Sequence, residues 1–118
     1  MRAKLTQALF AAYPALYRGR VLSVRENLMS YGFACGDGWY PIIDRLSTTL
    51  TRHIGELPVE KRDDYYAFQV KEKFGALRFY MTRSTQEMED AISAAAQESL
   101  RTCEECGEPG ETNDEGRE

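Results

Sequence analysis

Apolar residues recur every three or four positions across the middle of the chain, which is the spacing of one face of an α-helix. These positions are Trp39, Ile42, Ile43, Leu46, Leu50, Ile54 and Leu57. Asp37 stands where an N-cap is expected, and Pro41 is tolerated in a first turn whose backbone donors lack intrahelical partners. The pattern predicts a helix over residues 38–54.

Alternation of apolar and polar side chains replaces the helical pattern between residues 66 and 81. The two alternating runs are "YAFQVK" and "LRFYM", and the short stretch "EKFG" lies between them. Period-two patterning on both sides of a glycine-containing connection predicts an antiparallel β-hairpin. Because an isolated two-stranded ribbon is only marginally stable, the apolar face must lie on helices or beside a third strand from residues 21–33.

Two further helices are expected at the ends of this body. The first covers residues 3–13 and ends at Tyr13, because Pro14 disfavours helical geometry in the residue before it. The last opens with Ser84 and Glu87 as a capping box. Its buried stripe consists of Met88, Ala91, Ile92 and Ala95. Residues 14–38 mix helical and strand patterns and end in a glycine-rich stretch that predicts a tightly turning loop.

The sequence therefore predicts one α+β domain over residues 1–103, with a β-hairpin or three-stranded sheet packed on two to three helices. A length of 118 residues suits one hydrophobic core, and 42% apolar with 29% charged residues is typical of a globular protein. No stretch approaches the ~20 apolar residues of a membrane span. Three cysteines, an odd number, do not match a secreted disulfide framework, which favours a cytoplasmic location.

Charge is distributed unevenly along the chain. The formal net charge is −4, and residues 104–118 carry seven acidic side chains against Arg117. The preceding residues are close to neutral. Like charges without apolar residues cannot pack, so residues 104–118 are expected to form a flexible, acidic tail.

Cys103 and Cys106 are spaced as in one half of a zinc ribbon, in the sequence "CEECGEPG". Cys35 and His53 are the remaining conventional ligands, but the predicted helix separates them by about 20 Å, so one ion cannot readily reach both. A zinc ion would then be shared between chains or held by an incomplete site, and the alternative is two reduced thiols. Redox catalysis is disfavoured because the pair follows a helix C-terminus among glutamates.

Three separated segments resemble small proteins of tailed phages and prophages, most of them of unknown function. The segments are "YGFACGDGWYPIIDRL", "QVKEKFGALRFYM" and "ESLRTCEECGEPG", and together they cover most of residues 31–110. In many of these phage proteins a further Cys and a Cys or His complete a zinc ribbon, whereas here "ETNDEGRE" follows. The resemblance implies a phage-encoded protein and supplies no activity.

The leading functional hypothesis is a protein-binding accessory protein that modulates a host or phage complex, such as a defence system, or that self-associates. Its candidate contact residues are aromatic: Trp39, Tyr40, Tyr66 and Tyr80. The alternative is nucleic-acid binding through the hairpin, with Phe74 and Tyr80 between cations. Those cations are Lys71, Lys73, Arg78 and Arg83. Glu72 and a sequence pI near 5.1 weigh against this alternative.

An enzyme is not expected. Asp37 with His53 could form an acid–base pair, and the adjacent Asp63 and Asp64 could bind a metal, but the sequence offers no nucleophile beside either pair. Adjacent aspartates point to different sides of an extended chain, so this doublet is better explained as a polar turn before the hairpin.

Overall fold

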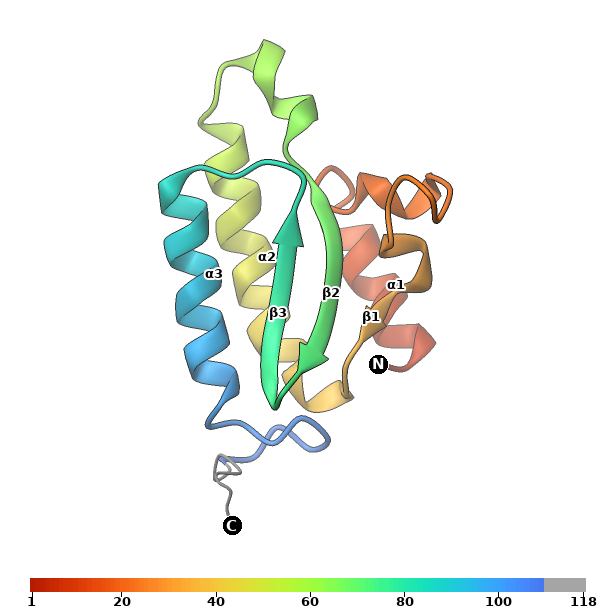
Figure 1. Cartoon of the computed structure of the whole chain (residues 1–118), viewed down its shortest axis with the longest axis vertical. Coiled ribbons are helices and arrows are strands. Elements are labelled where there is room, and N and C mark those ends of the chain that lie inside the picture. Colours follow the sequence, from red (N-terminus) through yellow and green to blue (C-terminus); the bar gives the residue numbers. More distant parts are fainter. Residues whose placement is uncertain (110–118) are drawn as a thin grey trace.

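The computed structural model describes residues 1–109, which form three α-helices, four short 3-10 helices and a three-stranded sheet (Figure 1). The helices are α1 (Ala3–Ala12), α2 (Tyr40–Gly55) and α3 (Gln86–Ser99), and the strands are β1 (Phe33–Ala34), β2 (Ala67–Lys73) and β3 (Ala76–Met81). The α+β fold class and the positions of all three helices are confirmed. None of these helices combines the length and apolar character needed to cross a bilayer.

The sheet has the order β1-β2-β3, with β2 and β3 antiparallel and β1 parallel to β2. Val70 lies opposite Phe79, and Lys71 lies opposite Arg78. The hairpin turns at Phe74 and Gly75, where both φ angles are positive, at 56° and 82°. A two-residue turn with φ > 0 at both positions matches the right-handed twist of the strands. The third strand expected from residues 21–33 is only two residues long and begins at Phe33.

Helices α1 and α2 lie behind the sheet in Figure 1, and α3 runs beside β3. The core between these layers holds Leu9, Trp39, Ile43, Leu50, Val70, Leu77 and Met88, among others. Tyr17 is fully buried, and its ring meets Phe33 edge to face with centroids 5.2 Å apart. Its hydroxyl lies 2.6 Å from Ser47 Oγ on α2, so the polar end of the ring is satisfied inside the core.

The connection between α1 and β1 follows β2 through isolated polar contacts rather than a long strand. The buried Asn27 side chain donates from Nδ2 to the Ala67 carbonyl at 3.0 Å and accepts from the Met29 amide at 2.8 Å. The Leu28 amide donates to the Phe68 carbonyl at 3.0 Å. These bonds satisfy backbone groups of an irregular segment, in which the mixed apolar pattern predicted no helix or strand.

Two predicted caps are wrong. Asp37 does not cap α2, since its carboxylate accepts from the backbone amide of Arg2 at 2.8 Å and from Arg2 Nε at 2.6 Å. It therefore joins the beginning of α1 to the glycine-rich loop. The N-cap of α3 is Thr85, whose side chain accepts from the Met88 amide, rather than Ser84. Ser84 instead donates to Glu89.

Candidate functional site

Residues 103–109, here called the cysteine turn, form a compact knuckle after α3. The Cys106 amide donates to Cys103 Sγ at 3.4 Å, and the Gly107 amide donates to the Cys103 carbonyl at 2.8 Å. The Cys103 amide donates to the Glu108 carbonyl at 2.8 Å, and Gly107 has a φ of +80° that favours glycine. The "CxxCG" spacing, which the sequence shares with one half of a zinc ribbon, thus places the Cys106 amide toward the Cys103 sulfur.

The cysteine turn is attached to the glycine-rich loop before α2. The Gly38 amide donates to the Glu104 carbonyl at 2.6 Å, and the Gly36 amide donates to the Glu104 carboxylate at 2.8 Å. Trp39 Nε1 donates to the Thr102 carbonyl at 3.0 Å. Glu104, the first residue of the predicted acidic tail, is therefore bonded to the body of the domain. The rest of the predicted acidic tail, residues 110–118, lies outside the described residues.

The described residues do not complete a zinc site. Within residues 1–109, no three His, Cys, Asp or Glu side chains form a group that could hold a metal ion. Cys35 is buried, and burial raises the pKa of its thiol to about 12. His53 is half-buried near the C-terminal end of α2, 3.4 Å from Glu56, whereas the cysteine turn lies against the N-terminal end of that helix. Two thiols are half of the four ligands that structural zinc uses.

The electrostatic argument against a thiolate at Cys103 is wrong in direction. The Cys106 amide, followed by the Cys106 side chain and the Glu105 amide, holds the pKa of the Cys103 thiol below its usual range. The neighbouring glutamates were expected to raise that pKa. Hydrogen bonds from amides fixed by the turn act at closer range than these carboxylate charges.

We expect iodoacetamide to modify Cys103 in the native protein while Cys35 stays unmodified until the protein unfolds. The thiolate is the reactive form, so the midpoint of Cys103 alkylation against pH should lie below about 8.5, the ordinary value for cysteine. Mass spectrometry of peptides after timed alkylation measures both rates. A Cys106→Ala variant keeps the main-chain amide and isolates Cys103 as the reactive thiol of the turn. Equal labelling of Cys35 and Cys103 in the native protein would contradict this assignment.

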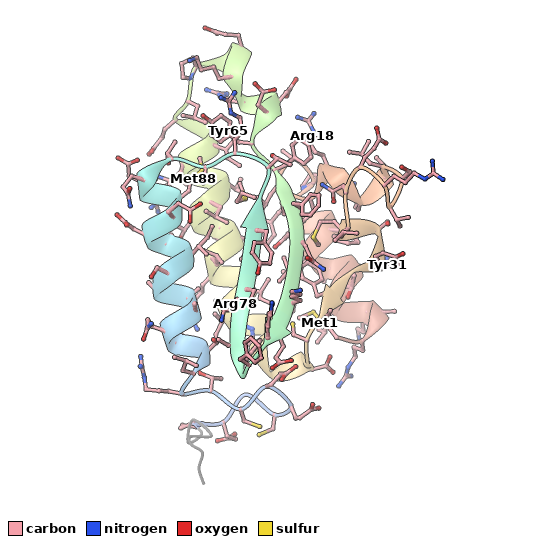
Figure 2. All side chains as sticks on the ribbon, in the orientation of Figure 1. Met1, Arg18, Tyr31, Tyr65, Arg78 and Met88 are labelled. Atoms are coloured by element: carbon pink, nitrogen blue, oxygen red, sulfur yellow. The ribbon has the colours of Figure 1, made fainter. Side chains whose placement is uncertain are left out.

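A second candidate site is the open sheet face, which we define as Gln69, Lys71, Lys73, Arg78 and Tyr80. Lys71 lies opposite Arg78, and Gln69 lies opposite Tyr80, so alternation places these side chains on the same side of the hairpin. The opposite side carries the buried Val70, Leu77 and Phe79. Figure 1 looks onto the open sheet face, which no helix of residues 1–109 covers, and Figure 2 labels Arg78 there.

Three of the four nucleic-acid candidates meet on the open sheet face. Within residues 1–109, no carboxylate forms a salt bridge with Lys71, Lys73 or Arg78. Arg83, the fourth candidate, lies beyond β3 and is 3.7 Å from Asp64. Phe74 extends the surface at the hairpin tip, where its side chain is 85% exposed and Lys73 Nζ lies 5.5 Å from the ring centroid.

The four aromatic candidates do not form one patch. Trp39 is only 1% exposed and bonded to Thr102, so its assignment to a protein-binding surface is corrected: it belongs to the core. Tyr40 is half-buried and is the first residue of α2, so it does not belong to the hairpin that carries Tyr80. Tyr66 is half-buried with Arg18 over its ring, 5.9 Å from the centroid. Only Tyr80, 41% exposed, lies on the open sheet face.

The residue pairs considered for enzyme chemistry do not meet. Asp37 is bound to Arg2, and hydrogen bonds from the Arg2 amide and side chain lower the pKa of the Asp37 carboxyl. His53 lies toward the other end of α2. Asp63 pairs with Arg18 at 2.9 Å, which is the behaviour of a surface turn rather than a metal site.

Comparisons of this chain with known proteins identified no relative. No family model matches the chain, and neither the search of curated proteins nor that of solved structures found a match. The resemblance to phage proteins stays a prediction that depends on its three sequence motifs.

Proposed function

We propose that this chain is a small accessory protein that binds another protein through its open sheet face and the Phe74 tip. The observation that carries the proposal is the placement of Lys71 directly opposite Arg78 on an uncovered face, beside the exposed Tyr80. Tyr, Phe and Arg are enriched at protein interfaces relative to the rest of the surface, and a central arginine is a frequent hot spot.

Two features of this surface are unfavourable for the isolated chain. Like charges directly opposite each other on antiparallel strands are destabilising. A bulky residue with positive φ is also rare, and Phe74 has a φ of 56°. Local departures from good sequence-to-structure agreement concentrate at functional sites. A partner that supplies carboxylates to the cations and a pocket to the Phe74 ring would offset both costs.

The same features indicate an acidic partner. The chain is acidic overall, with a net charge of −4, so the cations of the open sheet face form a local exception. Complementary charge speeds association and selects the partner more than it adds affinity. The resemblance to phage proteins supplies the setting, since a phage accessory protein in the bacterial cytoplasm would meet host or phage complexes, including defence systems.

Single-stranded nucleic acid is the second candidate, because three cations lie together with two exposed aromatic rings. Stacking of bases on aromatic side chains and phosphate contacts from cations are sufficient for such binding. Three cations predict a weak complex whose affinity falls with a log–log salt slope of about −2. A labelled oligonucleotide at low salt tests this candidate directly.

We expect the double variant Lys71→Glu with Arg78→Glu to lose the partner. The full chain, immobilised and exposed to nuclease-treated bacterial lysate, should retain at least one protein that the variant retains about tenfold less, as mass spectrometry can quantify. Reversing both charges removes the attraction and adds repulsion toward an acidic surface. The matched control is Arg52→Glu with Lys61→Glu, which makes the same change of charge at exposed positions away from the sheet. Equal retention by the two variants would overturn the proposal.

A second variant separates binding from folding. Phe74→Asn creates an Asn-Gly turn, the pair preferred where both residues need positive φ, so its free energy of unfolding should rise by about 1 kcal/mol. The same variant should weaken partner binding because it removes the exposed ring. A more stable protein with weaker binding cannot be explained by misfolding. Unchanged binding would exclude the hairpin tip from the surface.

A further inference from the structure

We infer that the partner supplies an extended segment that adds to β3 as a fourth strand, in the groove between β3 and α3. This inference rests on the proposed function and specifies its binding mode. The sheet order β1-β2-β3 gives β3 a neighbouring strand on one side only. In Figure 1 the other side of β3 faces α3.

Hydrogen bonds fix which backbone groups of β3 face that groove. The Thr82 amide donates to the Tyr66 carbonyl at 2.8 Å, so Tyr80 and Arg78, at even spacing from Thr82, direct their backbone groups toward β2. The Leu77 amide donates to Ser99 Oγ on α3 at 2.9 Å. Phe79 and Met81 are two and four residues after Leu77, so their amides and carbonyls point to the same side as those of Leu77, toward α3.

The amides and carbonyls of Phe79 and Met81 point away from β2. Within residues 1–109, they make no hydrogen bond to a residue outside the β2–β3 pair. Such a row of unpaired donors and acceptors is a template for another strand. Proteins usually protect an edge with proline, a bulge, an inward-pointing charge or a covering helix. Strand β3 has no proline, inward charge or bulge, because its sequence is "ALRFYM" and the bulge of the sheet lies on β2 between Ala67 and Gln69. Helix α3 is bonded to the edge at Leu77 through Ser99, but it leaves a groove beside Phe79 and Met81.

A groove of about 450 Å³ accompanies this edge. One wall is β3, and the other is formed by α3 through Glu89, Ile92, Ser93, Ala96 and Gln97. Ser93 and Ala96 are short, so the helix wall leaves space next to the strand. Helix-flanked edges that accept a peptide strand are a recurrent mode of recognition, in which the main chain gives affinity and alternate side chains give specificity.

Alternation along an added strand defines the chemistry of the segment. Side chains on one side would lie next to Arg78 and Tyr80 on the open sheet face, where carboxylates are favoured. Side chains on the other side would lie next to Phe79 and Ile92, where apolar groups such as valine are favoured. The occupant is therefore an extended segment of alternating acidic and apolar residues. A second copy of this chain is disfavoured, because pairing two β3 edges brings two sets of the same cations together.

The test uses the full chain, labelled with ¹⁵N, and a synthetic capped peptide of alternating valine and glutamate, six residues long. Binding should shift the amide resonances of Phe79 and Met81 and slow their hydrogen exchange at least tenfold at saturation. The same peptide with lysine in place of glutamate should bind at least tenfold more weakly. A valine–glutamate peptide that is N-methylated at alternate residues should also bind at least tenfold more weakly, because it loses the backbone N–H donors along one edge of the strand. No binding of the valine–glutamate peptide, or binding without effect on Phe79 and Met81, would overturn the inference.

Two variants test the groove itself. Met81→Pro removes an amide that faces outward and leaves the β2–β3 ladder intact, which is where an edge strand tolerates proline. It should weaken peptide binding about tenfold. Ser93→Trp fills the groove from α3 and should do the same, whereas Ala94→Trp places equal bulk on the opposite flank of α3, in the groove with α2, and should not.

The outcomes separate the binding mode from the proposed function. If Arg78→Glu weakens retention of the lysate partner while Met81→Pro and Ser93→Trp leave it unchanged, the open sheet face binds protein but strand addition is wrong. If all three variants retain the partner as the unmodified chain does, both proposals are wrong. If Met81→Pro and Ser93→Trp lose binding and Ala94→Trp keeps it, the result supports the addition of a partner strand to β3.

Discussion

Replacing Asn27 by Asp is expected to lower the free energy of unfolding by about 3 kcal/mol at pH 7. Asn27 is 0% exposed, and its Nδ2 donates to the Ala67 carbonyl at 3.0 Å. An ionised Asp keeps the acceptor for the Met29 amide but places a charged oxygen against the Ala67 carbonyl in a buried site. The site cannot relax easily, since a Cβ at Gly19 would lie 2.2 Å from Asn27 Nδ2.

The loss should depend on pH. Burial against the Ala67 carbonyl raises the folded-state pKa of the new carboxyl above its unfolded value of about 3.9. Below that pH the group is protonated in both states, and its hydroxyl can donate to Ala67. The destabilisation relative to the unmodified chain therefore grows as pH rises from about 4 toward the folded-state pKa and is then constant.

Urea denaturation of both proteins at several pH values between 4 and 8 measures this difference. Asn27→Ala is the control, because it removes the same hydrogen bonds without adding a titratable group, so its deficit should not vary with pH. A pH-independent deficit for Asn27→Asp would show that the carboxyl is solvated and that residues 23–31 do not hold Asn27 against β2.

Asn27 also shows where sequence-based prediction reached its limit. Helix α2 and the hairpin were predictable because seven apolar positions at helical spacing, and two alternating runs, each repeat one physical period. Residues 14–38 have no period, since their order comes from single polar contacts such as that of Asn27 with Ala67, forty positions later. Nothing in "RENLM" distinguishes this buried amide from a solvated one. A third strand from residues 21–33 was considered, but the bounds of β1 were not predictable because two residues are too few to alternate.

The candidate sites divide in the same way. The alternation that predicted the hairpin also places Lys71 and Arg78 on one face, so the open sheet face could be predicted from the sequence. Trp39 belonged to the apolar stripe of the helix predicted over residues 38–54, and that pattern was a better guide to its burial than its residue type. The attachment of Glu104 to Gly38 was not predictable, because it joins two loops through backbone atoms that carry no sequence signal.

The packing of these two loops leads to the second large effect, at Gly38. A Cβ at this position would lie 2.2 Å from the Cys103 carbonyl oxygen and 2.4 Å from the Gly107 nitrogen. Both are backbone atoms, so Gly38→Ala must displace the cysteine turn and break the bond from the Gly38 amide to Glu104. Forced overpacking costs about 1–3 kcal/mol, and the lost hydrogen bonds add to it, so we expect the free energy of unfolding to fall by about 3 kcal/mol.

Gly55→Ala is the matched control, since within residues 1–109 its added Cβ would meet no atom within 4 Å other than those of its chain neighbours and its own helix backbone, and the residue ends α2. Alanine there should be neutral or stabilise the protein by up to about 1 kcal/mol. The chain contains one tryptophan, and Trp39 Nε1 is bonded to Thr102, so its emission reports the position of the turn. In Gly38→Ala this emission should shift to longer wavelength in the native state. Stability and emission equal to those of the unmodified chain would mean that the cysteine turn is not held against the glycine-rich loop, and Cys103 and Cys106 would then have no fixed place on the fold.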